Sequence, residues 1–127
     1  MRRVNYSALT LHYFETAPCA GVLSDPGTLR GAAGSRAHGA WVQFDLRAHD
    51  GIIETARFLA FACPHTIAVA AWVAERAAGR DLEAALPESV QELSERFDVP
   101  VEKKGRLLII EDAWLAAVSA APIRGAT

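Results

Sequence analysis

The stretch from Asp50 to Ala68 reads D-G-I-I-E-T-A-R-F-L-A-F-A-C-P-H-T-I-A and holds the turn, strand and helix signals that decide the fold. Asp-Gly is typical of the tip of a β-hairpin, and residues 52–62 are the predicted returning strand. A helix is predicted from about residue 65 to 78, and Gly79 is its stop signal. This pattern places Cys63 at a helix N-terminus, where unsatisfied N–H groups and a partial positive charge stabilise a thiolate.

The residues before that turn predict the partner strand. From Ala40 to Arg47 the apolar positions recur with a period of two, which is typical of a half-buried strand. Residues 19–23 are a candidate for a further short strand. Residues 24–39, by contrast, contain four glycines and few large apolar groups, so we expect a mobile loop there.

Helices are expected at both ends of the chain. A short amphipathic helix over residues 6–15 has Ser7 or Asn5 as its cap and is ended by Pro18. Another is predicted over residues 88–97, with Pro87 in its first turn. Residues 107–110 alone would suit a buried strand, but a longer window favours a helix ended by Pro122. Its apolar positions are Leu107, Ile110, Trp114, Ala117 and Ala121.

The order of elements predicts an α+β fold in which a small antiparallel sheet of about three strands packs against helices. At 127 residues we expect a single domain over residues 1–127. The formal net charge of −2 argues against nucleic-acid binding, which normally shows as excess Lys and Arg. The longest apolar stretch, residues 58–74, is short for a membrane span, and no signal peptide is evident. We therefore expect a cytoplasmic protein that does not bind membranes and whose two cysteines are thiols.

Four segments, over roughly residues 6–121, match motifs that occur together in one known protein family. Tyr6-Ser7 with H-Y-F-E at 12–15 and Gly21 resembles its opening Y-S…H-F-E-N-P…G. D-G-I-I-E at 50–54 with A-R-F at 56–58 resembles D-G-x-I-x-D-A-R-F. F-A-C at 61–63 with Ile67-Ala68 resembles F-G-C-x-x-x-I-A, and E-D-A at 111–113 with Ala116-Ala117 resembles the closing A-E-D-A…A-A. The spacings agree without gaps from residue 38 to 118, so the chain resembles the N-terminal class of IscU/NifU iron–sulfur cluster assembly scaffolds, and the fold that the resemblance implies is the SufE/NifU-like one.

The chain departs from the family at most of the expected cluster ligands. Where the family has C-G-D, this sequence has His38-Gly39-Ala40, and where the family has H-C it has Gly105-Arg106. Only Cys63 keeps a thiol at a ligand position. The family motif L-P-P-V-K, at which an Hsp70-type chaperone docks, corresponds to Val99, Pro100, Val101, Glu102 and Lys103. Val99, Pro100, Val101 and Lys103 are thus candidate partner-binding residues, although Glu102 brings a charge to an apolar position.

Cys63 is the main candidate site residue, and the alternative is a small buried hydrophobe. The candidate metal ligands are Cys63, His38, His65 and Cys19, because thiolate and imidazole both bind iron. The alternatives are a solvated loop histidine at 38 and a packing role for Cys19. His65 could equally assist the loss of the thiol proton. Arg106 cannot bind a metal, but near Cys63 it would lower the pKa of the thiol and so favour a persulfide.

Three functions are therefore in view, all in iron–sulfur cluster assembly and none of them enzymatic. The first is a divergent scaffold-like protein that binds iron, a labile iron–sulfur cluster or zinc through Cys63, with a homodimer or a partner supplying missing ligands. The second is a sulfur acceptor in which Cys63, beside Arg106, takes a persulfide from a cysteine desulfurase without any cluster. The third is an interaction protein that has lost its metal. Further expected partners are iron–sulfur chaperones and acceptor apoproteins.

Overall fold

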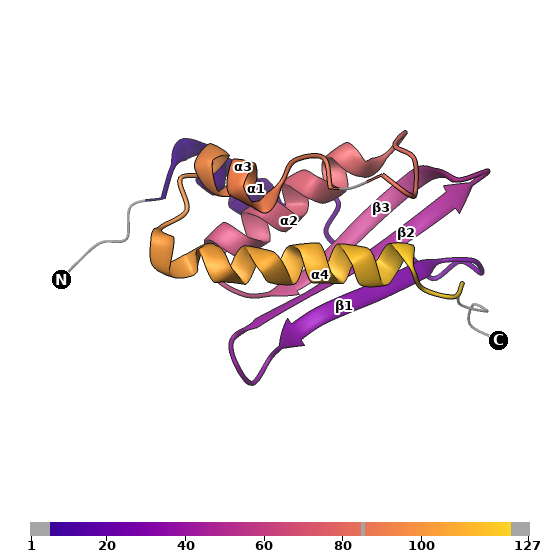
Figure 1. The fold of residues 1–127 in the computed structure, drawn as a ribbon, viewed down its shortest axis with the longest axis horizontal. Coiled ribbons are helices and arrows are strands. Elements are labelled where there is room, and N and C mark those ends of the chain that lie inside the picture. The colour runs from indigo at the N-terminus through magenta and orange to yellow at the C-terminus, as the bar shows by residue number, and fades with distance from the viewer. Residues whose placement is uncertain (1–5, 85, 123–127) are drawn as a thin grey trace.

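In the described part of the chain, three antiparallel strands in the order β1–β2–β3 form one sheet, and helices cover one of its faces (Figure 1). The computed structural model describes residues 6–84 and 86–122. The elements are α1 (Ala8–Thr16), β1 (Leu29–Ser35), β2 (Ala40–His49), β3 (Ile52–Phe61), α2 (Pro64–Ala77), α3 (Val90–Arg96), the 3-10 helix η1 (Val101–Arg106) and α4 (Leu107–Val118). Helix α4 packs on β1 and β2, α2 packs on β3, and α1 packs on α2.

The β2–β3 hairpin confirms the two strands predicted around Asp50-Gly51. Both turn residues have positive φ, 52° for Asp50 and 78° for Gly51, as a two-residue hairpin turn of type I′ requires. The pairing runs from His49 opposite Ile52 at the turn to Trp41 opposite Phe61 at the far end. The alternate residues Val42, Phe44 and Leu46 are fully buried under the helices. Trp41 and Phe61 therefore lie on the other face of the sheet.

Strand β1 corrects the prediction of a loop over residues 24–39, which is wrong for Leu29–Ser35. The strand is rich in small residues because α4 crosses it closely. A Cβ atom built on Gly31 would lie 2.0 Å from the backbone nitrogen of Ala117. Arg30 on this strand pairs with the buried Asp45 of β2 at 2.8 Å, and Asp45 also accepts from the Leu23 N–H at 2.9 Å. Because these contacts need a glycine and a charged residue in β1, the sequence of the strand does not alternate between apolar and polar residues, and it therefore predicts a loop.

Residues 19–23 do not form the predicted strand. Ala20 makes one isolated parallel bridge to Phe58, and the backbone carbonyl of Cys19 accepts from the Phe58 N–H at 2.9 Å. Because β2 is the only strand of the described sheet beside β3, this segment covers part of the outer edge of β3, and an isolated bridge from Ile52 to Asp81 covers another part.

The helices confirm the predicted α+β class, with small shifts at their ends. Ser7 caps α1 by accepting from the Thr10 N–H, and Asn5 lies outside the described residues. Helix α3 begins at Val90, two residues later than predicted, because Ser89 and Glu92 form a capping box. Helix α4 ends at Val118, before Pro122, and its residues Leu107, Ile110 and Trp114 join the core.

Candidate functional site

Cys63 is the N-cap residue of α2, at the strand-to-helix junction that the sequence predicts. Its backbone is extended, with φ −72° and ψ 162°, and Pro64 follows at the first helical position, where a missing N–H costs nothing. The thiol is partly exposed, and its Sγ lies 3.5 Å from Oγ1 of Thr66. The junction therefore presents a sulfur atom at the positive end of a fourteen-residue helix.

The surroundings of Cys63 favour its thiolate form. Burial alone would raise the pKa of the thiol, but hydrogen bonds from the side chain and backbone of Thr66 act in the opposite direction. A hydrogen bond from Arg106 and the charge of Lys103 add to them, so the pKa of Cys63 lies below its ordinary value. A thiolate is the nucleophilic form of cysteine, which suits Cys63 to attack on another sulfur.

Both cations come from η1, the 3-10 helix that leads into α4. Its sequence, V-E-K-K-G-R, carries three cations and one carboxylate, and none of its residues is buried. The packing of α4 against the sheet carries the end of η1 to the same end of the molecule as the start of α2 (Figure 1). Arg106 was a sequence candidate, whereas Lys103 was a candidate only for partner binding, and Thr66 was missed. Thr66 could have been found from its position three residues after the expected N-cap, Cys63, because this spacing brings the two side chains together.

His65 does not extend toward solvent beside Cys63 but is 1% exposed in the core. Its ring centroid lies 4.7 Å from that of Tyr6. Among the described residues, neither ring nitrogen has a hydrogen-bond partner. Burial lowers the pKa of His65, the charge of Lys103 lowers it further, and Asp98 opposes them. His65 is therefore neutral at pH 7 and packs against Tyr6.

The structure brings His38 to the end of the sheet that holds Cys63, but it separates Cys19 from that end. His38 is exposed in the turn between β1 and β2, where its N–H donates to the Ser35 carbonyl at 3.2 Å. The pairing of Trp41 with Phe61 places this turn and Cys63 beyond the same end of the hairpin. Cys19 instead lies beside Phe58, and the strand from Phe58 to Phe61 alone covers about 10 Å.

The residues around Cys63 do not fit an iron–sulfur cluster or zinc held by one chain. Within residues 6–84 and 86–122 there is no group of three or more His, Cys, Asp or Glu side chains that could hold a metal ion. The neighbours of the sulfur are a hydroxyl group and two cations, Arg106 and Lys103. A cation repels a metal ion and stabilises an anionic sulfur, so this donor set suits a thiolate or persulfide.

The candidate partner-binding segment is only partly accessible. Val99 is 6% exposed and belongs to the core, Pro100 and Lys103 are half-buried, and Val101 is 78% exposed. Val101 is thus the most exposed of these four residues, Pro100 and Lys103 are partly accessible to a partner, and docking there stays a prediction.

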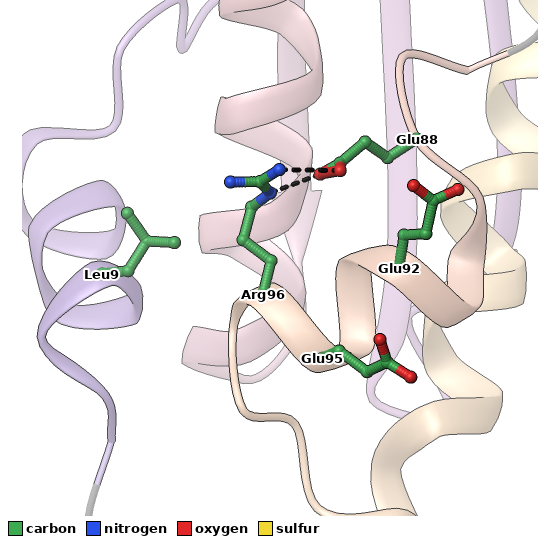
Figure 2. Close-up of a pocket in the computed structure, with 5 residues that line it drawn as sticks. All are labelled: Leu9, Glu88, Glu92, Glu95 and Arg96. Atoms are coloured by element: carbon green, nitrogen blue, oxygen red, sulfur yellow. Dashed lines mark hydrogen bonds and ion pairs between the residues drawn. The ribbon is translucent and has the colours of Figure 1, made fainter.

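A hollow that Cys63 does not line lies between α1 and α3 (Figure 2). It is lined by Leu9, Glu88, Glu92, Glu95 and Arg96. Its carboxylates already have partners, because Glu88 pairs with Arg96, Glu92 accepts from the Ser89 N–H, and Glu95 accepts from Gln91. This hollow therefore offers no free group for chemistry.

Comparisons with known proteins agree with the fold and the motifs. The family described as NifU-like N terminal domain matches residues 5–126. The iron–sulfur cluster assembly scaffold protein IscU of Haemophilus influenzae is 29% identical over 117 residues, 90% of this chain and 93% of that protein.

Among solved structures, one is named as an iron–sulfur cluster assembly scaffold for the SUF system of Fervidobacterium islandicum. It has a TM-score of 0.71 at 13% identity, over 90% of this chain and 96% of that one. The N-terminal NifU-like protein of Brucella abortus has a TM-score of 0.58 at 17% identity, over 90% and 87% of the two chains. In the described residues no helix has both the length and the apolar character that crossing a bilayer requires.

Proposed function

Because the chain belongs to the NifU-like N-terminal domain family, we propose that it acts in iron–sulfur cluster assembly as a sulfur acceptor whose Cys63 receives sulfane sulfur from a protein persulfide. The donor is a cysteine desulfurase, which forms such a persulfide on its own cysteine. The observation that carries the proposal is the placement of Cys63 at the N-terminus of α2 beside Arg106 and Lys103, with no second thiol near it in the described chain.

The transfer step needs a nucleophile and a stabilised product. The Cys63 thiolate attacks the outer sulfur of the donor persulfide, a bond forms between Cys63 Sγ and that sulfur, and the sulfur–sulfur bond of the donor breaks. The donor cysteine leaves as a thiolate, so no external oxidant or reductant is needed. The new persulfide is itself anionic near pH 7, and Arg106 and Lys103 favour it as they favour the thiolate.

The second candidate function is the binding of iron, a labile cluster or zinc at Cys63. Membership of the family supports this function more strongly than the residues around Cys63 do. The relatives are named as cluster assembly scaffolds. In this chain such a cargo would need ligands from a second copy or from a partner, with Cys63 and His38 as the contribution of this end of the sheet. A permanent cation at Arg106 weakens that arrangement.

Incubation of the protein with a cysteine desulfurase and cysteine tests the proposal. We expect the intact mass to rise by one sulfur atom, in the parent and in Cys19→Ser but not in Cys63→Ser. A parallel anaerobic reconstitution with iron and sulfide tests the second candidate. Absence of added sulfur together with a visible absorption lost in Cys63→Ser would overturn the acceptor function in favour of cluster binding. If neither signal appears, the interaction-protein hypothesis replaces both.

A further inference from the structure

An aromatic pair, the exposed Phe61 and the partly exposed Trp41, lies at the end of the hairpin nearest Cys63. Trp41 and Phe61 are directly opposite each other in the β2–β3 register and point away from the helix-covered face. Phe61 is 55% exposed and lies two residues before Cys63. The guanidinium carbon of Arg36 sits 4.7 Å from the centroid of the Trp41 ring. Aromatic side chains and arginine are the residue types that dominate binding at protein interfaces.

The charges at this end differ in sign from those of the chain as a whole. Helix η1 has three cations and one carboxylate, Glu102, which gives +2; Arg36 adds one positive charge and Asp98, whose charge acts on His65, adds one negative charge, so the sum is +2. The whole chain carries −2, so the remaining residues carry −4. In the described residues no carboxylate forms an ion pair with Arg36, Lys103 or Arg106. These three cations are therefore available to a ligand that carries negative charge.

We propose that Trp41 and Phe61, with Arg36, Lys103 and Arg106, form a docking surface for an acidic segment of the sulfur-donor protein. The surface rests on the proposed function, because it commits to the donor as the occupant and places its persulfide beside Cys63. Apolar contact with the aromatic pair supplies the buried centre of the interface. The cations around it attract carboxylates that flank the donor cysteine and speed the encounter at low ionic strength.

Two synthetic donor peptides test the charge preference. Each carries a single persulfidated cysteine, flanked by Asp and Glu in one peptide and by Lys and Arg in the other, and transfer to the full chain is followed by intact mass. We expect the acidic donor to react about tenfold faster at low salt. The ratio should approach one at high salt, roughly 0.5 M, where the Debye length falls to about 4 Å. A basic donor that reacts equally fast or faster at low salt would overturn the proposal.

Matched variants test whether the preference for the acidic donor arises from this surface. Arg36→Glu should reduce the preference for the acidic donor severalfold, whereas Arg47→Glu should not, although it changes the net charge equally. Arg47 lies on the same face of β2 but toward the other end, six residues from Trp41, or about 20 Å. Phe61→Ser should slow transfer from the acidic peptide, whereas Leu115→Ser, at a similarly exposed residue of α4, should not. Equal effects within either pair of variants would refute the assignment of the surface.

Trp41 provides a direct binding signal. Trp72 and Trp114 are 4% and 1% exposed, so acrylamide quenching of tryptophan emission reports mainly on Trp41. We expect the acidic peptide without its persulfide to protect this emission and the basic peptide not to do so. Inorganic polysulfide separates the two proposals, because it loads Cys63 without docking. If polysulfide loads Cys63 but the peptides show no charge preference, the docking surface fails and the acceptor function stands. Light scattering that shows a dimer lost in Phe61→Ser would assign the surface to a second copy of this chain instead.

Discussion

Gly31 offers the sharpest test of how the fold holds the site, because it lies where α4 crosses β1. A Cβ at this position would stand 2.0 Å from the Ala117 nitrogen, 2.4 Å from the Ala116 carbonyl carbon and 2.5 Å from the Ala117 Cα. All three atoms belong to the backbone of the helix, so no side chain can rotate away. We predict that Gly31→Ala forces α4 away from the sheet.

The size of the effect follows from these distances. Non-bonded heavy atoms in contact normally stand about 3.5 Å apart, so the helix must withdraw by roughly 1.5 Å at Ala117. Overpacking of a well-packed core costs about 1–3 kcal/mol, and a backbone-to-backbone clash belongs at the upper end, about 3 kcal/mol. For a chain of this size we expect the midpoint of thermal unfolding to fall by roughly 10 °C.

Thermal and urea unfolding measure this loss, with Gly105→Ala as the matched control. Gly105 lies just before α4, its φ is not positive, and a Cβ there would meet nothing within 4 Å. The control should therefore be neutral or stabilised by about 0.4–1 kcal/mol. Adding Ala117→Gly to Gly31→Ala should not restore stability, since the clash does not involve the Ala117 side chain. A Gly31→Ala protein within about 0.5 kcal/mol of the parent would refute the argument.

Three further predictions concern the site and its supports. The rate of Cys63 alkylation by iodoacetamide, followed against pH, should have a midpoint below that of the urea-unfolded chain, and Arg106→Gln should raise it. Because the pKa of Cys63 is lowered in the folded state, its contribution to stability is present above the unfolded pKa and is lost as pH falls through the folded pKa. An unchanged midpoint in Arg106→Gln would contradict the role of that residue. Asp45→Ala removes the partner of Arg30 and of the Leu23 N–H, so the free energy of unfolding measured in urea should fall by about 2 kcal/mol. An unchanged free energy would mean that solvent replaces both contacts. Ser89→Ala breaks the capping box of α3 and should cost about 1 kcal/mol, unlike a Gln91→Ala control on the exposed face of the same helix.

The parts of the fold that were predictable have strong local signals. An Asp-Gly pair between alternating segments predicted the β2–β3 hairpin, because few sequences adopt positive φ at two successive residues. The apolar run after Cys63 predicted α2, and helical spacing over a long window identified α4.

Strand β1 could not be predicted because its stability comes from its neighbours. The sequence L-R-G-A-A-G-S has low intrinsic preference for a strand. Its small residues are required by the passage of α4, and its register is set by pairing with β2 and by Arg30 on Asp45. Both causes lie far away in the sequence, so the local pattern resembles a loop.

The sequence by itself determined the strand–turn–strand–helix unit that puts Cys63 at a helix N-terminus, because hairpin turns and helix starts depend on residues close in the chain. Only the tertiary structure decided what surrounds that sulfur. Packing of α4 on the sheet brings Arg106 and Lys103 to Cys63, core packing draws His65 against Tyr6, and the segment along β3 keeps Cys19 away. These contacts join residues up to 59 positions apart, as Tyr6 and His65 are, and long-range contacts depend on how whole elements pack rather than on any local pattern.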